Sequence, residues 1–222
     1  MATSTQDTYQ ARVLDGLANA SSSVRLQAAM ATGTDPDPRY LDALVERCGT
    51  EPDFSVREML TWALTQHPPS MTVPKVVAEL RSERALARSQ ALHTLSKIGD
   101  RQAWPAITVS LLTDADDEVA RTAWRTAVVL APEGAQHELA EVLATQFGRG
   151  DRGTQLSLSR ALIGLGEVIM PMLRAASTDP EPRVRQHAVA TEALLRDPDT
   201  EFGLAIEEAK RIAALGPTRQ QG

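Results

Sequence analysis

The 222-residue chain is acidic and poor in aromatic residues, which narrows the class of protein that it can be. Its formal net charge is −6, and hydrophobic residues make up 42% of it but aromatic residues only 4%. The acidic balance argues against sequence-independent nucleic-acid binding, which requires a basic surface. A core filled mainly by Ala and Leu favours packed helices over β-sandwiches, which are rich in β-branched and aromatic residues.

The sequence also limits the cellular setting that we expect. Cys48 is the only cysteine, so a disulfide framework and a cysteine-rich metal site are excluded. No apolar run reaches the roughly 18 residues of a membrane span. Residues 1–7 lack the charged and then apolar layout of a signal peptide. We therefore expect a cytoplasmic protein that does not enter a membrane.

A short pattern recurs along the chain, in which a small apolar residue and usually Arg precede a helix rich in Ala and Leu. Its six occurrences are Val24-Arg25, Val56-Arg57, Ala87-Arg88, Ala120-Arg121, Thr154-Gln155 and Val184-Arg185. Subtracting successive first positions gives spacings of 32, 31, 33, 34 and 30 residues. Self-similarity at such a period predicts a repeat architecture.

Each repeat is predicted to contain two helices joined by a short turn. The first helices are expected at 39–48, 73–81, 102–112, 135–147 and 167–176, and Pro or Gly separates one repeat from the next. The expected array spans 8–198, in repeats of approximately 8–34, 38–67, 71–99, 101–131, 133–166 and 167–197. Residues 1–7 are expected to be a disordered N-terminus, 199–216 a helix that caps the array, and 217–222 a disordered tail. The fold class is therefore all-α, with about six helix pairs and the C-terminal capping helix.

The second helix of each repeat has a predicted buried stripe and a predicted outer face. Counted from the small apolar residue, offsets 4, 7 and 8 share one face and are apolar or small, so we expect them in the core. Offsets 3 and 6 lie away from that stripe and are expected at the surface. The turns before these helices are acidic or hydroxylic and are expected to cap them, as at Asp53, Asp116 to Glu118, Asp179 to Glu181 and Ser21 to Ser23.

The repeating Val-Arg-x-x-Ala-x-x-Ala-Leu, with Asp and Pro in the preceding turn, resembles the HEAT repeat, particularly its short bacterial form. The best matches are Val184-Arg185-Gln186-His187-Ala188 after Asp179-Pro180, and Ala87-Arg88-Ser89-Gln90-Ala91-Leu92. The resemblance covers roughly residues 8–196 and implies a right-handed α-α superhelix. It also implies a ladder of structural arginines, each bonding to acidic or carbonyl groups in a neighbouring turn. These are Arg25, Arg57, Arg88, Arg121 and Arg185, and Gln155 interrupts the ladder.

The sequence offers little sign of catalytic chemistry. The four histidines are not spaced as metal ligands, and there is no glycine-rich phosphate loop or nucleophile elbow. Residues 148–153 are interpreted as a connecting loop. We therefore expect no catalytic residue, no metal site and no cofactor.

The second helices line the concave side of HEAT stacks, so a partner is expected there. The residues proposed to contact it are Met30, Met59, Trp62, Gln90, His93 and Arg160. Trp is enriched in binding hot spots and Met adapts to irregular surfaces. The alternative at Trp62 is that the ring tucks against the neighbouring helix and exposes only its edge.

The sequence thus favours a non-enzymatic scaffold or adaptor that binds a protein or peptide on its concave surface, monomeric by default. Nucleic acid is not the expected partner. The alternative is a nucleic-acid enzyme similar to the bacterial HEAT-like glycosylases for alkylated bases, which use aromatic residues and an acid in a basic groove. Trp104 and Trp124 invite that comparison, but Trp104 is expected to pack at a helix start and Trp124 to lie in the core.

Overall fold

The computed structural model describes residues 2–197, 206, 207 and 210, and every regular element among them is a helix. The all-α expectation is confirmed. Contacts divide the chain into two compact units, Met1–Ile107 and Thr108–Gly222, here called unit 1 and unit 2 and described separately. The boundary falls inside the expected fourth repeat.

Unit 1 consists of successive helix pairs followed by a short helix. Its elements are α1 (Ala2–Leu17), α2 (Ser22–Thr34), η1 (Pro38–Tyr40), α3 (Leu41–Cys48), α4 (Phe54–Thr65), α5 (Pro69–Glu79), α6 (Ala85–Ile98) and η2 (Arg101–Ala106). Unit 2 continues the alternation. Its elements are α7 (Val109–Leu112), α8 (Asp117–Leu130), α9 (Gln136–Ala144), α10 (Arg152–Gly164), η3 (Gly166–Ile169), α11 (Met170–Ser177) and α12 (Pro182–Arg196).

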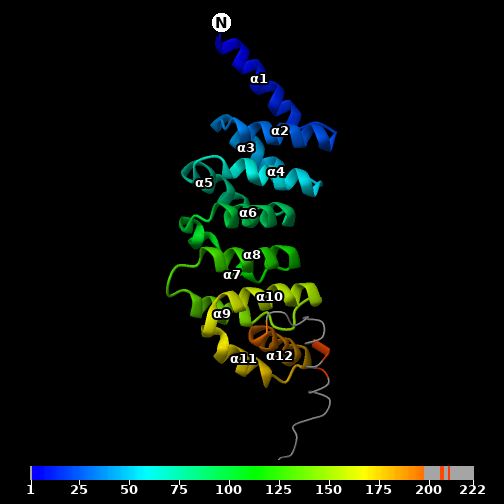
Figure 1. Ribbon diagram of the computed structural model, residues 1–222, viewed down its shortest axis with the longest axis vertical. Helices are drawn as coiled ribbons and strands as arrows, with labels where there is room; N and C mark the ends of the chain where they lie inside the picture. Colours follow the sequence, from blue (N-terminus) through cyan, green and yellow to red (C-terminus); the bar gives the residue numbers. More distant parts are fainter. Residues whose placement is uncertain (1, 198–205, 208–209, 211–222) are drawn as a thin grey trace, which may run out of the picture. The chain divides into compact units, whose positions relative to one another are not determined.

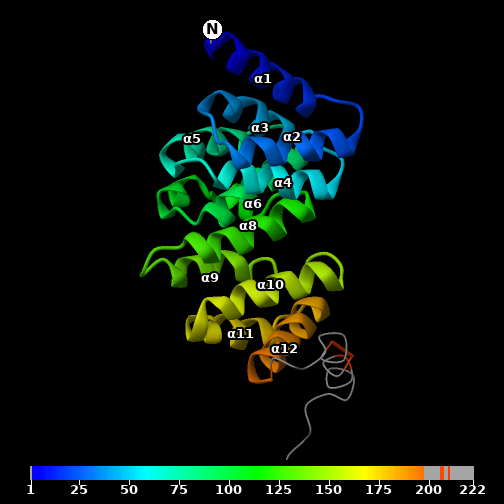
Figure 2. The ribbon, with the colours of Figure 1, turned by 45° about the horizontal axis from the view of Figure 1, so that its top comes forward.

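The helices of each unit form two rows. The second helices of the pairs, which we call B helices, lie side by side: α2, α4 and α6 in unit 1, and α8, α10 and α12 in unit 2 (Figure 1). The first helices, which we call A helices, form the other row: α1, α3 and α5 in unit 1, and α7, α9 and α11 in unit 2 (Figure 2). Within each unit, neighbouring repeats therefore pack on one another, as in a helical solenoid.

Acidic residues begin most of the B helices. The side chains of Asp53, Asp116, Asp151 and Glu181 accept hydrogen bonds from backbone N–H groups in the first turns of α4, α8, α10 and α12. These N–H groups have no partner inside the helix, so the caps stabilise the helix starts. Ser21 precedes α2 without such a side-chain bond, so the expected hydroxyl cap is not formed there.

The expected buried stripe is clearest in the second, third and fifth repeats. Every residue at offsets 4, 7 and 8 there is buried: Leu60, Ala63, Leu64, Ala91, Thr94, Leu95, Leu158, Ala161 and Leu162. The small side chains among them let neighbouring helices approach closely, while the leucines fill the space between the rows. Trp124, expected in the core, is fully buried, and its Nε1–H donates to the carbonyl of Leu112 at 2.8 Å.

Other expectations differ from the structure. Residues 2–7, expected to be disordered, belong to α1, whose buried Gln10, Val13 and Leu17 share one face at helical spacing. The helix expected over 102–112 is broken into η2 and α7, because Pro105 lacks an N–H donor and Ile107 leaves the helical conformation. The expected capping helix and tail, 199–222, lie outside the described residues except for Ile206, Glu207 and Lys210.

Candidate interaction surface

Four of the five predicted ladder arginines make the same pair of hydrogen bonds. Each donates from Nη1 to the carbonyl oxygens six and five residues earlier, over 2.6–3.1 Å, as seen for Arg25, Arg57, Arg88 and Arg185. All four lie four residues after the N-cap position of their helix. The guanidinium therefore closes the turn before its own helix by binding carbonyls that have no helical partner.

Arg25 also reaches the next repeat through a buried carboxylate that the sequence did not single out. Glu51 is 0% exposed and accepts from Arg25 Nε and Nη2, both at 2.7 Å, and from Arg47 Nε at 2.8 Å. It also accepts the backbone N–H of Asp53 at 2.9 Å. Burial alone would raise the pKa of Glu51, but these donors outweigh it and lower the pKa to about 2.

Arg121 does not occupy the same position as the other ladder arginines. It lies five residues after its cap, Asp116, so it is turned about 100° around α8 relative to the others. Its Nε donates to Ser157 Oγ at 3.1 Å instead of bonding to turn carbonyls. Arg149 occupies the turn, with Nε donating to Asp117 Oδ1 at 2.8 Å and Nη2 donating to the carbonyl of Asp114.

The repeat that lacks a ladder arginine is joined to the next by a buried histidine. His187 is 0% exposed, and its Nδ1 accepts the N–H of Gly148 at 3.0 Å. The proton is therefore assigned to Nε2, which lies 2.9 Å from the carbonyl of Gln155 and 3.0 Å from Ser159 Oγ. Burial lowers the pKa of His187 to about 4, although the bond to Gln155 acts in the opposite direction.

Trp62 lies on the outer face of unit 1, and its ring covers a glycine of the neighbouring B helix. Its side chain is 39% exposed, and that of Met30 on α2 is 49% exposed. A Cβ atom added to Gly33 of α2 would lie only 2.3 Å from Trp62 Cζ3. The ring therefore packs against the adjacent helix while Trp62 stays partly exposed, and its contact with a partner stays a prediction.

The other proposed contact residues of unit 1 are less accessible. Met59, Gln90 and His93 are half-buried on α4 and α6. The Nε2 atom of His93 lies 3.1 Å from Glu58 Oε1, so the imidazole is held within this face. Arg160, the remaining member of the proposed set, is exposed on α10 of unit 2.

The expected outer positions are wrong in the fourth and sixth repeats. The residues at offsets 3 and 6 there are Ala123, Thr126, His187 and Ala190, and all four are fully buried. In the fourth repeat the predicted alignment is shifted by one residue, because Val119, and not Ala120, lies three residues after the N-cap residue Asp116. The outward position corresponding to Trp62 in this repeat is therefore Arg125, which is exposed.

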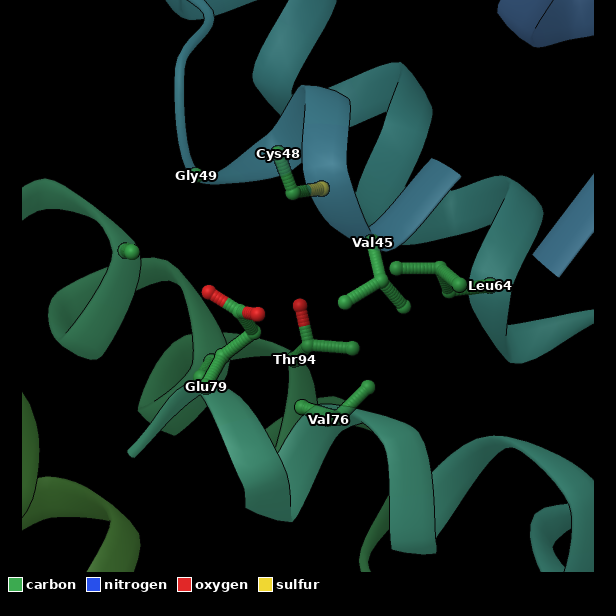
Figure 3. Close-up of a pocket in the computed structure, with 9 residues that line it drawn as sticks. Val45, Cys48, Gly49, Leu64, Val76, Glu79 and Thr94 are labelled. Carbon is green, nitrogen blue, oxygen red and sulfur yellow. The ribbon is translucent and has the colours of Figure 1, made fainter. Parts of the chain in front are cut away.

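A small cavity of about 10 Å³ lies in unit 1 where α3, α4, α5 and α6 meet. Figure 3 shows the Cys48 side chain, the Glu79 carboxylate and the Thr94 hydroxyl around it. A space of this size holds no more than about one water molecule. Burial raises the pKa of Cys48 to about 12, so the thiol is not a nucleophile at neutral pH.

The part of the chain that the structure describes contains no group of three or more His, Cys, Asp or Glu side chains placed to hold a metal ion. Within the same residues, no helix is both long enough and apolar enough to cross a membrane.

The comparison with protein families agrees with the repeat. Residues 50–128 match the family model described as HEAT repeats, so the family resemblance is confirmed. No curated protein matches the sequence.

Two crystal structures described as engineered proteins are similar to the chain. One is 20% identical, with 89% of this chain and 96% of that chain covered and a TM-score of 0.47. The other is 17% identical, with 90% and 98% covered and a TM-score of 0.45.

Proposed function

We propose that this HEAT-repeat chain is a non-enzymatic scaffold that binds a protein or peptide partner on the B-helix face of unit 1. The observation that carries the proposal is the placement of Trp62, which is 39% exposed while its ring rests on Gly33. A half-exposed indole fixed by its neighbour loses little conformational entropy on binding, which is typical of hot-spot residues.

The surroundings of Trp62 support a partner with an apolar surface. Met30 adds a second exposed apolar side chain one helix away. The outward positions of α2, α4 and α6 at offsets 3 and 6 are Gln27, Met30, Met59, Trp62, Gln90 and His93, and none of them is a carboxylate, Lys or Arg. The cores of protein interfaces are similarly poor in charged residues and rich in Trp and Met.

The alternative, a nucleic-acid enzyme of the glycosylase kind, requires a continuous basic groove around the aromatic residue. The neutral outward positions around Trp62 favour the scaffold over that enzyme. HEAT repeats generally serve as scaffolds, which favours the same proposal.

The test is to compare partner capture by the wild type, Trp62→Ala and Phe54→Ala. Phe54 is a matched control because it is 67% exposed on the same helix but lies at the first position of α4. A partner identified from the wild-type capture should then be purified, and its affinity measured by calorimetry. We expect Trp62→Ala to weaken binding at least about tenfold, a loss of about 1.4 kcal/mol, and Phe54→Ala to leave it unchanged. Equal affinities for the three proteins would refute the proposed site.

A further inference from the structure

Three arginines gather on the outer face of the B helices of unit 2, away from the ladder positions. Arg121 and Arg125 lie one turn apart on α8, and Arg160 lies on the adjacent α10. Arg125 and Arg160 are exposed, and the side chain of Arg121 is 37% exposed. The sequence analysis proposed only Arg160 as an outward arginine, because its alignment of the fourth repeat was shifted by one residue.

Two contacts fix how α8 and α10 lie against each other. Arg121 Nε donates to Ser157 Oγ at 3.1 Å, and a Cβ on Gly164 would lie 3.1 Å from Val128 Cγ1. The partners in both contacts are 36 residues apart (157 minus 121, and 164 minus 128), so the two helices run parallel in that register. Arg160 therefore lies level with position 124, one residue from Arg125.

Helical geometry places one exposed arginine on each side of the line of contact between α8 and α10, here called the seam. Arg125 lies about 40° around α8 from Arg121, and Arg160 lies about 60° around α10 from Ser157 in the opposite sense. The guanidinium groups thus flank the seam on the solvent side, and Arg121 lies within it one turn earlier.

The negative charge that the described residues place near this cluster faces Arg121: hydrogen bonds from Thr154 and the nearby Arg121 guanidinium lower the pKa of Asp151. Glu118 Oε2 lies 3.4 Å from Arg121 Nη1, and no described carboxylate forms an ion pair with Arg125 or Arg160. The Arg125 guanidinium donates only to Thr122 Oγ1, at 3.2 Å. Positive charges without paired carboxylates attract an anionic partner.

The chain itself covers the neighbouring face of α10. Ile206 forms a buried cluster with Ala190 and Leu194 of α12, and Leu156 and Ile163 of α10 pack against that cluster. The surface between α10 and α12 is therefore occupied. Arg160 lies between this covered face and the side of α10 that meets α8, since it is about 60° around the helix from Ser157 and Leu156 is about 100° away in the same sense. This leaves a basic site of limited length rather than a stripe along the unit.

We propose that unit 2 binds an acidic peptide segment across the seam between α8 and α10, with carboxylates paired to Arg125 and Arg160. Arginine is suited to this because its planar guanidinium can bind a carboxylate through two parallel hydrogen bonds. The short extent of the cluster favours a peptide over a nucleic acid, which needs a longer row of phosphate contacts. The inference extends the proposed scaffold to a second surface but does not depend on Trp62.

The test uses the full chain labelled with ¹⁵N, and the Nε–Hε signals of its arginines are followed by NMR. The probes are a hexaglutamate peptide, a hexalysine peptide and a six-nucleotide thymidine DNA strand, each at the same ionic strength. We expect hexaglutamate to shift the signals of Arg121, Arg125 and Arg160, and hexalysine to leave them unchanged. Absence of these shifts with hexaglutamate would overturn the proposal, and so would tighter binding of the DNA strand at the same arginines.

Two double variants separate this cluster from general surface charge. Arg125→Gln with Arg160→Gln should raise the Kd for hexaglutamate at least about tenfold. The matched control, Arg174→Gln with Arg196→Gln, removes the same charge from exposed positions on α11 and α12 and should change the Kd less than about twofold. Equal losses in the two double variants would show non-specific attraction and refute the site.

Two further variants complete the design. Lysine at positions 125 and 160 should recover part of the affinity, because the charge returns without the paired hydrogen bonds. Recovery of full affinity would contradict the carboxylate pairing. Trp62→Ala should bind hexaglutamate like the wild type, so the outcome here stays distinguishable from that at the proposed site of unit 1.

Discussion

The buried carboxylate of Glu51 should be a principal determinant of the stability of unit 1. Glu51→Gln keeps the size of the side chain but replaces one acceptor oxygen by an NH₂ group that faces the donors of Arg25 and Arg47. Arg25 is only 5% exposed, so its charge would remain in the protein without a counter-charge in contact. Removing one partner of a buried ion pair typically costs about 3–5 kcal/mol.

The pKa of Glu51 gives a second measure of the same contacts. A fall from 4.5 to about 2 corresponds to roughly 3 kcal/mol, which solvent around the partly exposed Arg47 reduces to about 2 kcal/mol. The two figures describe one set of interactions and are not added, so we expect Glu51→Gln to lower the free energy of unfolding by about 2–4 kcal/mol.

The assay is urea unfolding at pH 7 followed by circular dichroism, with Glu46→Gln as the matched control. Glu46 is exposed on α3 one turn before this site, so its change should stay within about 0.5 kcal/mol of the wild type. Because folding lowers the pKa of Glu51, its contribution is complete above pH 4.5 and is lost as the pH falls towards 2. Glu51→Gln should lose less stability than the wild type over that range. Equal stabilities of Glu51→Gln and Glu46→Gln at pH 7 would refute the reasoning.

Three further changes test other contacts. Burial lowers the pKa of His187 from 6.5 to about 4, so its contribution is complete above pH 6.5 and falls by about 3 kcal/mol as the pH drops towards 4. His187→Gln should flatten this part of a stability–pH curve, and an unchanged curve would contradict the assignment. Gly33→Ala should displace the Trp62 ring and cost about 1–3 kcal/mol, seen as a changed tryptophan emission and a lower Tm; an unaltered emission would show that the contact is absent. Asp53→Ala should cost about 1 kcal/mol in urea unfolding through loss of the α4 cap, whereas a change near zero would mean that the cap is not needed.

The repeat and the helical class followed from the sequence because they depend on local chemistry. Apolar residues at helical spacing, acidic caps and Pro or Gly breaks act within a few residues, so their pattern predicts helices without knowledge of the fold. The buried positions of Leu60, Leu64 and Leu158 followed from the same spacing. Trp124 was also expected in the core and is buried, although the corrected alignment of its repeat places it at offset 5 rather than 4.

The outer face was harder to predict, because it depends on how each helix is rotated against its neighbours. Because the fourth repeat was misaligned by one residue, the buried Ala123 and Thr126 were predicted to be at the surface. The exposed Arg125 was not predicted to be there. His187 shares the offset of exposed residues in other repeats. It is buried because its imidazole meets the Gly148 N–H and the Gln155 carbonyl of the preceding repeat.

The sequence by itself thus determined the helices, the period of the repeat and most of the buried stripe, since each arises from neighbours along the chain. Only the tertiary structure decided that Glu51 joins two turns, that Gly33 supports Trp62, and that Arg121 of α8 bonds to Ser157 of α10. Those contacts join residues between 26 and 36 positions apart. Their geometry is set by the packing and rotation of whole helices, for which a single sequence carries no local signal.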